Sequence, residues 1–192
     1  YIVIKYLNNE IKEAQSYYTT IFVSCVILSL FVFSLEMLFY FNLSGILNIP
    51  NNLLRDVKTL FLLIFLSSIC HGIGASFNAI YYVKNRMDLY GISVIAENIV
   101  KGILMLVLYI SKSIGLISLG YIILISTIIR YLFSINFSSK YMKEIKFDLN
   151  TFSIIKLKSI LKTGIWAIVS NSGNIIILNS ELILSNTLIG IE

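Results

Sequence analysis

The chain has 192 residues, of which 57% are hydrophobic and 13% are charged, with a formal net charge of +5 and a mean hydropathy of +0.87. This composition is more apolar than a soluble domain requires, because such a domain fills only one core with apolar side chains. It therefore excludes an ordinary water-soluble fold and indicates a chain whose main solvent is lipid.

Five stretches are long and apolar enough to cross a bilayer. A spanning helix needs roughly 20 mostly apolar residues, because each residue advances ~1.5 Å through a hydrocarbon layer of ~30 Å. Continuous runs of this length lack the alternation of a membrane β-barrel. The sequence thus predicts an all-α membrane protein with five spans, at Tyr17–Phe41, Val57–Tyr82, Gly91–Tyr109, Ile114–Phe137 and Gly164–Leu188.

The basic residues gather in alternate connectors, which predicts the orientation of the chain. One side is expected to be external and holds Arg55, Lys58 and Lys112. The other side is expected to be cytoplasmic and holds ten cations, namely Lys5, Lys12, Lys84, Arg86, Lys140, Lys143, Lys146, Lys156, Lys158 and Lys162. This distribution accounts for the net charge without a nucleic-acid partner.

The chain divides into three parts on this interpretation. Residues 1–137 carry four spans, residues 138–163 form a basic cytoplasmic linker, and residues 164–192 carry the fifth span. In the linker, Ile154, Leu157, Ile160 and Leu161 recur at helical spacing between lysines, which favours an amphipathic helix on anionic membrane lipids. A plain solvated linker is the alternative. Because the chain starts at Tyr1 and stops after an apolar run, we expect a part of a longer protein.

The cysteines and the tyrosines near span ends are expected to have structural roles. Cys25 and Cys70 have no CxxC partner or histidine cluster and are interpreted as small core residues. Glu36 is expected to reach the external interface. Tyrosines near span ends are expected to anchor the helices at the membrane surface: Tyr17, Tyr18, Tyr40, Tyr81, Tyr82, Tyr90, Tyr109 and Tyr141.

The second span carries two neighbouring polar or small faces. His71 and Asn78 lie on one stripe with Ser67 and Gly74, at steps of four, three and four residues. Beside it runs a small-xxx-small stripe, which lets two helices approach closely: Ser68, Gly72 and Ser76. The first stripe is predicted to line a cavity and the second to pack against a helix, although a structural role for His71 stays open.

Ionisable groups within spans are costly in lipid and are functional candidates by default. In the third span, Glu97 and Lys101 are spaced to form an ion pair. In the fourth, Arg130 has no carboxylate on its own helix, and it either borders a cavity or snorkels to the cytoplasmic interface. The fifth span is the most polar, with Asn171, Asn174 and Glu181 within one arc of the helix.

Catalytic patterns are nearly absent from the sequence. There is one histidine, and HExxH, a phosphate-binding glycine loop and a nucleophile elbow are all missing. The sequence therefore predicts neither an enzyme nor a cofactor or metal.

Several segments together resemble the bacterial flippases that translocate O-antigen and capsule polysaccharide precursors, which belong to the superfamily of the multidrug and toxic compound extrusion (MATE) transporters. The segments are residues 46–50 (ILNIP), residues 77–79 (FNA), residues 84–90 (KNRMDLY), residues 162–166 (KTGIW) and residues 188–190 (LIG), with Asn171, Gly173 and Glu181. The position of Glu181 is usually aspartate in such relatives.

The resemblance implies part of a MATE-like transporter with twelve to fourteen helices in the bacterial cytoplasmic (inner) membrane. Its cargo would be an oligosaccharide on a polyprenyl pyrophosphate, moved by alternating access and coupled to H⁺ or Na⁺. The expected cavity contains cations for the pyrophosphate and amides or other polar groups for the sugar: Arg130, Lys101, His71, Asn78, Asn171, Asn174 and Glu181. Alternatives are a drug or cation extruder of the same fold, a membrane enzyme of polysaccharide assembly, and a non-transporting scaffold.

Overall fold

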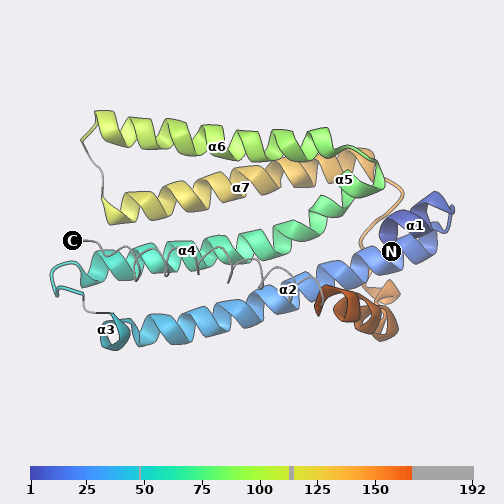
Figure 1. The fold of residues 1–192 in the computed structure, drawn as a ribbon, viewed down its shortest axis with the longest axis horizontal. Helices are drawn as coiled ribbons and strands as arrows, with labels where there is room; N and C mark the ends of the chain where they lie inside the picture. The colour runs from blue at the N-terminus through green and yellow to red at the C-terminus, as the bar shows by residue number, and fades with distance from the viewer. Residues whose placement is uncertain (48, 113–114, 166–192) are drawn as a thin grey trace, which may run out of the picture. The chain divides into compact units, whose positions relative to one another are not determined.

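The computed structural model describes residues 1–47, 49–112 and 115–165, and it divides the chain into two compact units, Tyr1–Phe152 and Ser153–Glu192. Within the described part of the first unit, the regular structure is helical (Figure 1). Its elements are α1 (Ile2–Leu7), α2 (Ile11–Phe41), α3 (Leu43–Ile46), α4 (Leu54–Gly74), η1 (Ala75–Asn78), α5 (Ala79–Val83), α6 (Met87–Ile110), α7 (Leu116–Tyr141) and η2 (Leu149–Thr151).

Four helical stretches of the described chain are long and apolar enough to cross a membrane: Ile11–Phe41, Leu54–Val83, Met87–Ile110 and Leu116–Tyr141. Each contains most of one predicted span, so the prediction of an all-α membrane protein is confirmed. The helices extend beyond several predicted ends, because polar residues at the membrane surface continue the helical hydrogen bonding. The predicted boundary at residue 137 falls inside α7, which continues to Tyr141. The fifth predicted span lies almost entirely outside the described residues.

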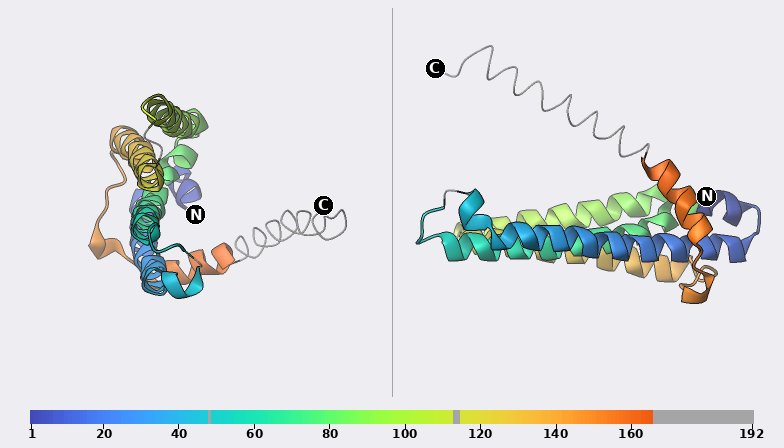
Figure 2. Two further views of the ribbon diagram at one scale, coloured as in Figure 1. Left: turned by 90° about the vertical axis from the view of Figure 1, so that its left-hand side faces the viewer. Right: turned by 90° about the horizontal axis from the view of Figure 1, so that it is seen from below.

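The four long helices of the first unit pack in the order α2, α4, α7, α6. Viewed end-on, they form a curved row (Figure 2). The two central stretches, Leu54–Val83 and Leu116–Tyr141, bury more of their apolar residues than α2 and α6, which each pack against one long helix. The remaining surface is rich in exposed leucine, isoleucine and phenylalanine, and this suits lipid or further helices.

Small residues set the helix contacts on both sides of α4. A Cβ atom at Gly72 would collide with the Ser29 side chain of α2, and one at Gly74 would collide with the Tyr131 ring of α7. The predicted close packing of the Ser68, Gly72 and Ser76 stripe is thus confirmed at Gly72. The neighbouring stripe, predicted to line a cavity, also packs at Gly74.

The second predicted span is not one regular helix. After Gly74, four residues adopt the 3₁₀ conformation of η1 before α5 begins, and α5 bends away from the axis of α4 (Figure 1). The Ser76 hydroxyl donates to the Ile73 carbonyl at 2.7 Å, and such side-chain bonds compete with the regular helical pattern. This break ends the straight part of the second span about two turns before Tyr82.

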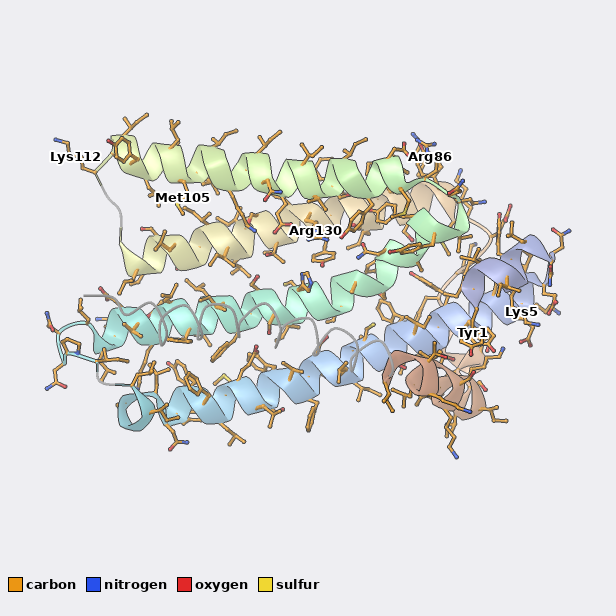
Figure 3. All side chains as sticks on the ribbon, viewed as in Figure 1. Tyr1, Lys5, Arg86, Met105, Lys112 and Arg130 are labelled. Atoms are coloured by element: carbon orange, nitrogen blue, oxygen red, sulfur yellow. The ribbon has the colours of Figure 1, made fainter. Side chains whose placement is uncertain are left out.

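The basic connectors of the first unit lie at one end of the row. Lys5 and Arg86 project at the end where α1, α5 and the end of α7 meet, whereas Lys112 lies at the opposite end (Figure 3). A buried cluster joins these elements, built from Ile2, Ala14, Tyr18, Tyr81, Val83, Leu89, Met142 and Ile145. The alternation of basic connectors in the sequence therefore corresponds to the two ends of the helix row.

Two tyrosines that were predicted to anchor at the membrane surface are instead buried. Tyr18 is 5% exposed and Tyr81 is fully enclosed. The Tyr81 hydroxyl donates to Ser134 at 2.9 Å and shares a hydrogen bond with Ser93 at 3.1 Å. Satisfied hydroxyls can be buried at low cost, so position near a span end does not by itself place a tyrosine in the headgroups.

The second unit is described only as far as residue 165. Residues 154–165 are helical, and the backbone N–H of Lys156 donates to the Ser153 hydroxyl at the start of this helix. The helix predicted from the spacing of Ile154, Leu157, Ile160 and Leu161 is therefore confirmed. Its position on a membrane surface stays a prediction.

Candidate functional site

A charged cluster lies within the spans, where α6 packs against α7. The Glu97 carboxylate of α6 accepts a hydrogen bond from Lys101 at 2.7 Å through Oε1 and one from Arg130 of α7 at 3.0 Å through Oε2. The Glu97 and Arg130 side chains are 10% and 14% exposed, whereas Lys101 is 38% exposed. One buried carboxylate thus holds two cations, and one of those cations keeps access to its surroundings.

The cluster lies near the middle of the lengths of α6 and α7. Glu97 lies ten residues after the start of α6 and Arg130 lies eleven residues before the end of α7. At ~1.5 Å per residue, each is about 15 Å from the basic end of its helix, which is half the thickness of the hydrocarbon layer. Arg130 lies near the middle of α7 (Figure 3), and its ion pair with Glu97 is mostly buried. The snorkelling alternative for Arg130 is therefore wrong in this structure.

Two aromatic rings and a hydroxyl complete the surroundings of Arg130. Its Nη2 donates to the Tyr90 hydroxyl at 3.3 Å, and its guanidinium carbon lies 5.5 Å from the centres of the Tyr90 and Tyr131 rings. These contacts stabilise a cation by hydrogen bonding and by the negative faces of the rings. Arg130 Nε is buried without a hydrogen-bond partner among the described residues. The guanidinium thus has an ion-pair partner and two ring contacts, and one of its N–H donors is unsatisfied within the described part of the chain.

His71 joins the cluster through the residue that follows Arg130. The Tyr131 hydroxyl and His71 Nδ1 share a hydrogen bond of 2.9 Å, and the two rings meet edge to face. One helical turn away on α4, Ser67 donates to Thr127 at 3.0 Å. The polar stripe of the second span therefore contacts α7, while the His71 side chain also remains exposed.

The exposed side of His71 lies in a groove between α2 and α4. The groove has a volume of about 400 Å³ and is lined by Leu28, Ser29, Val32, Ile64, Ser67, Ser68, His71 and Gly72. Ser68 donates to Glu36 at 2.8 Å across the same helix pair, so Glu36 lies against α4 and does not extend freely to the external interface as predicted. The groove offers hydroxyl and imidazole groups on a mostly apolar wall.

The structure brings together three of the predicted site residues. Arg130 and Lys101 meet at Glu97, and His71 joins them through Tyr131. Asn78 lies in η1, and its Oδ1 is buried without a hydrogen-bond partner among the described residues. The remaining predicted site residues, Asn171, Asn174 and Glu181, lie outside the described residues.

Sequence reasoning missed two of the aromatic residues and the full role of the carboxylate. Tyr90 was interpreted as an interface anchor, and Tyr131 was not singled out. Glu97 was predicted to pair with Lys101 but not to bridge to Arg130. The signal that could have predicted the bridge was the arginine itself. An arginine within a span is costly to bury alone, so a carboxylate on a neighbouring span is the expected partner.

Comparisons with known proteins found no relative of this chain. No family model matches the sequence, no curated protein matches it, and no solved structure matches the fold. The functional argument therefore rests on the residues and their contacts.

Proposed function

We propose that the protein translocates a polyprenyl-pyrophosphate-linked oligosaccharide across the membrane, in the synthesis of a cell-surface polysaccharide. The observation that carries this proposal is the sign of the charged cluster. Two cations, Lys101 and Arg130, surround one carboxylate, Glu97, so their formal charges leave a surplus of one positive charge in the cluster.

A surplus cation in the hydrocarbon region favours an anionic cargo. An isolated ionised group there costs at least ~2.5 kcal/mol by insertion scales, and an anion that enters the site offsets this cost. Lys101 is the reachable member, because it is 38% exposed and has one carboxylate contact. Pyrophosphate oxygens accept charge-assisted hydrogen bonds from both ammonium and guanidinium groups.

The groove beside His71 supplies the other kind of contact that this cargo needs. Sugar hydroxyls both donate and accept hydrogen bonds. The serine hydroxyls of the groove already donate to protein groups, so their oxygens remain to accept from a sugar, and the imidazole adds a further polar group. The polyprenyl tail can remain in lipid along the exposed apolar surfaces of the helices. Charge for the pyrophosphate, hydroxyls for sugar and a lipid-facing exterior for the tail are thus present in one unit.

A drug or cation extruder is the nearest alternative, and the two proposals differ in the sign of the cargo. An extruder of cations requires a surplus of carboxylate over cation at its site, because like charges repel the cargo. The described cluster has the opposite balance. A test that compares an anionic with a cationic cargo therefore distinguishes the two proposals.

The test is a translocation assay with the purified protein in sealed phospholipid vesicles. A fluorescent oligosaccharide on polyprenyl pyrophosphate is placed in one leaflet, and the fraction that becomes accessible to a membrane-impermeant quencher is followed with time. We expect protein-dependent translocation of this lipid and none of a lipophilic cation such as tetraphenylphosphonium. Movement of the cation without the pyrophosphate lipid would reject the flippase and favour the extruder.

A further inference from the structure

A second polar pocket lies at the basic end of the first unit, outside the charged cluster described above. It has a volume of about 420 Å³, within the usual range for a small-molecule site. Its lining combines two lysines, three hydroxyl groups and apolar side chains: Tyr18, Phe77, Ser138, Ser139, Met142, Lys143, Ile145, Lys146 and Phe147. The pocket is formed where the chain leaves α7 and crosses to α2.

The walls of this pocket are fixed by contacts on both sides. Met142 and Ile145 are 5% and 4% exposed and belong to the buried cluster at this end. Further along, the backbone N–H of Asp148 donates to the Thr19 hydroxyl of α2, and Ser16 donates to the Thr151 carbonyl. The segment that bears both lysines is therefore anchored at each end, with the lysine side chains exposed between the anchors.

The two lysines have no charged partner, although acidic residues lie nearby in the sequence. Neither Lys143 nor Lys146 forms an ion pair or a hydrogen bond within the described part of the chain. Glu144 accepts from the Tyr6 hydroxyl instead, and Asp148 Oδ1 accepts from the backbone N–H of Asn150. Neither carboxylate lines the pocket, so the pocket wall keeps a net positive charge.

The end of α7 does not cancel this charge. The last carbonyls of a helix carry roughly half a negative charge, whereas the two lysines supply two positive charges. An anion in the pocket therefore gains more from the lysines than it loses to the helix end. The Ser139 hydroxyl donates to the Ile135 carbonyl, so the two lysine ammonium groups are the donors that this wall offers to an anion.

Another wall of the pocket is aromatic and matches an acyl chain. Phe22 of α2 contacts Phe77 and Phe147, with ring centres 5.8 and 4.9 Å apart. Phe147 is 45% exposed, so this aromatic surface is open to its surroundings. A ligand that places an anion on the lysines and a hydrocarbon chain on the phenylalanines satisfies both walls at once.

We propose that this pocket binds the phosphate headgroup of an anionic phospholipid in the leaflet that faces the basic end of the protein. Lys143 and Lys146 bind the phosphate, and Phe77 and Phe147 contact the start of the acyl chains. This site goes beyond the proposed translocation and does not depend on the identity of the cargo. It would fix the basic end of the helix row at the depth of the headgroups.

Native mass spectrometry of the whole chain in detergent, titrated with phosphatidylglycerol, tests this site. Each lysine at an anionic headgroup contributes about fivefold in affinity, so Lys143→Gln with Lys146→Gln is expected to weaken the tightest binding roughly 25-fold. The control variant Lys58→Gln with Lys112→Gln loses the same charge at the opposite end and should bind as the unmodified chain does. Replacement of Lys143 and Lys146 by arginine should preserve binding.

Two further ligands test whether the pocket selects an anionic phospholipid or any phosphate. Phosphatidylcholine, which has no net charge, should bind weakly and equally to all variants. Inorganic phosphate in millimolar excess should not displace phosphatidylglycerol, because it cannot contact the phenylalanines. Equal loss of binding in both double glutamine variants would reject the site as a specific one, and displacement by inorganic phosphate would reject the phospholipid as its occupant.

Discussion

Glu97 of α6 and Arg130 of α7 form an ion pair of 3.0 Å between two helices that cross the membrane side by side. Lys101 binds the other oxygen of the same carboxylate at 2.7 Å. Pairing lowers the cost of burying the Glu97 and Arg130 charges in lipid. The positive charge of Lys101 then remains in excess. This arrangement links the stability of the α6 and α7 packing to the chemistry of the proposed site.

Glu97→Gln should destabilise the protein by about 3 to 5 kcal/mol, because it leaves Arg130 buried without its carboxylate. Removing both charges with Glu97→Gln and Arg130→Gln should cost less than the sum of the two single changes. Unfolding in detergent, followed by circular dichroism, measures this coupling. Asp88→Asn is the control, because it breaks an exposed pair with Arg86 and should change the stability far less. Additive effects of Glu97 and Arg130 would show that the ion pair does not stabilise the helix contact.

Gly72→Leu should destabilise the contact of α4 with α2 by about 1 to 3 kcal/mol, because the added side chain collides with Ser29. Gly102→Leu on α6 is the matched control, since nothing lies within 4 Å of a Cβ atom there. The control should be neutral or slightly stabilising because leucine favours a helix more than glycine does. Thermal unfolding of both variants in detergent measures the difference. Equal stability of the two variants would place the Gly72 face in lipid.

Tyr81→Phe should cost about 1 to 3 kcal/mol, because it removes a hydroxyl that bonds to both Ser93 and Ser134 and leaves their hydroxyls buried with fewer partners. The neighbouring Tyr82 is 60% exposed, so Tyr82→Phe should change the free energy of unfolding by less than about 0.5 kcal/mol. The two variants differ only in position. A similar effect at both positions would mean that the break at η1 does not bury Tyr81.

The topology can be measured with single cysteines in a chain whose Cys25 and Cys70 have been replaced. A membrane-impermeant thiol reagent should label a cysteine at Asn51 in intact cells and leave one at Lys143 unmodified until the membrane is opened. This result is expected because the excess of basic residues in alternate connectors predicts that the basic end of the row faces the cytoplasm. Labelling of the Lys143 position in intact cells would invert the orientation.

Hydropathy and spacing predicted the parts of this structure that depend on one helix at a time. The four described spans follow from runs of apolar residues, and the Glu97 and Lys101 pair follows from a spacing of four residues. The close approach at Gly72 was likewise visible in the repeat of small residues. In each case the signal lies within a single helix.

The parts that were not predicted depend on which helices are neighbours. Arg130 is 33 residues from Glu97, and its partner becomes known only when α7 is placed beside α6. Tyr131 and His71 are 60 residues apart and meet for the same reason, across α4 and α7. Tyr81 follows η1, whose four residues interrupt a span that hydropathy treats as one continuous helix.

The central claim is that the surplus positive charge of the cluster binds the pyrophosphate of the cargo, and Lys101→Gln tests it most directly. This change removes the surplus charge while the buried Glu97 and Arg130 remain paired, so the fold should persist. Lys112→Gln, outside the spans, is the control for loss of charge. In the vesicle assay we predict that Lys101→Gln slows translocation of the pyrophosphate-linked oligosaccharide roughly tenfold, the effect of one charge-assisted hydrogen bond, with an unchanged melting temperature. Translocation by Lys101→Gln at the unmodified rate would contradict the account.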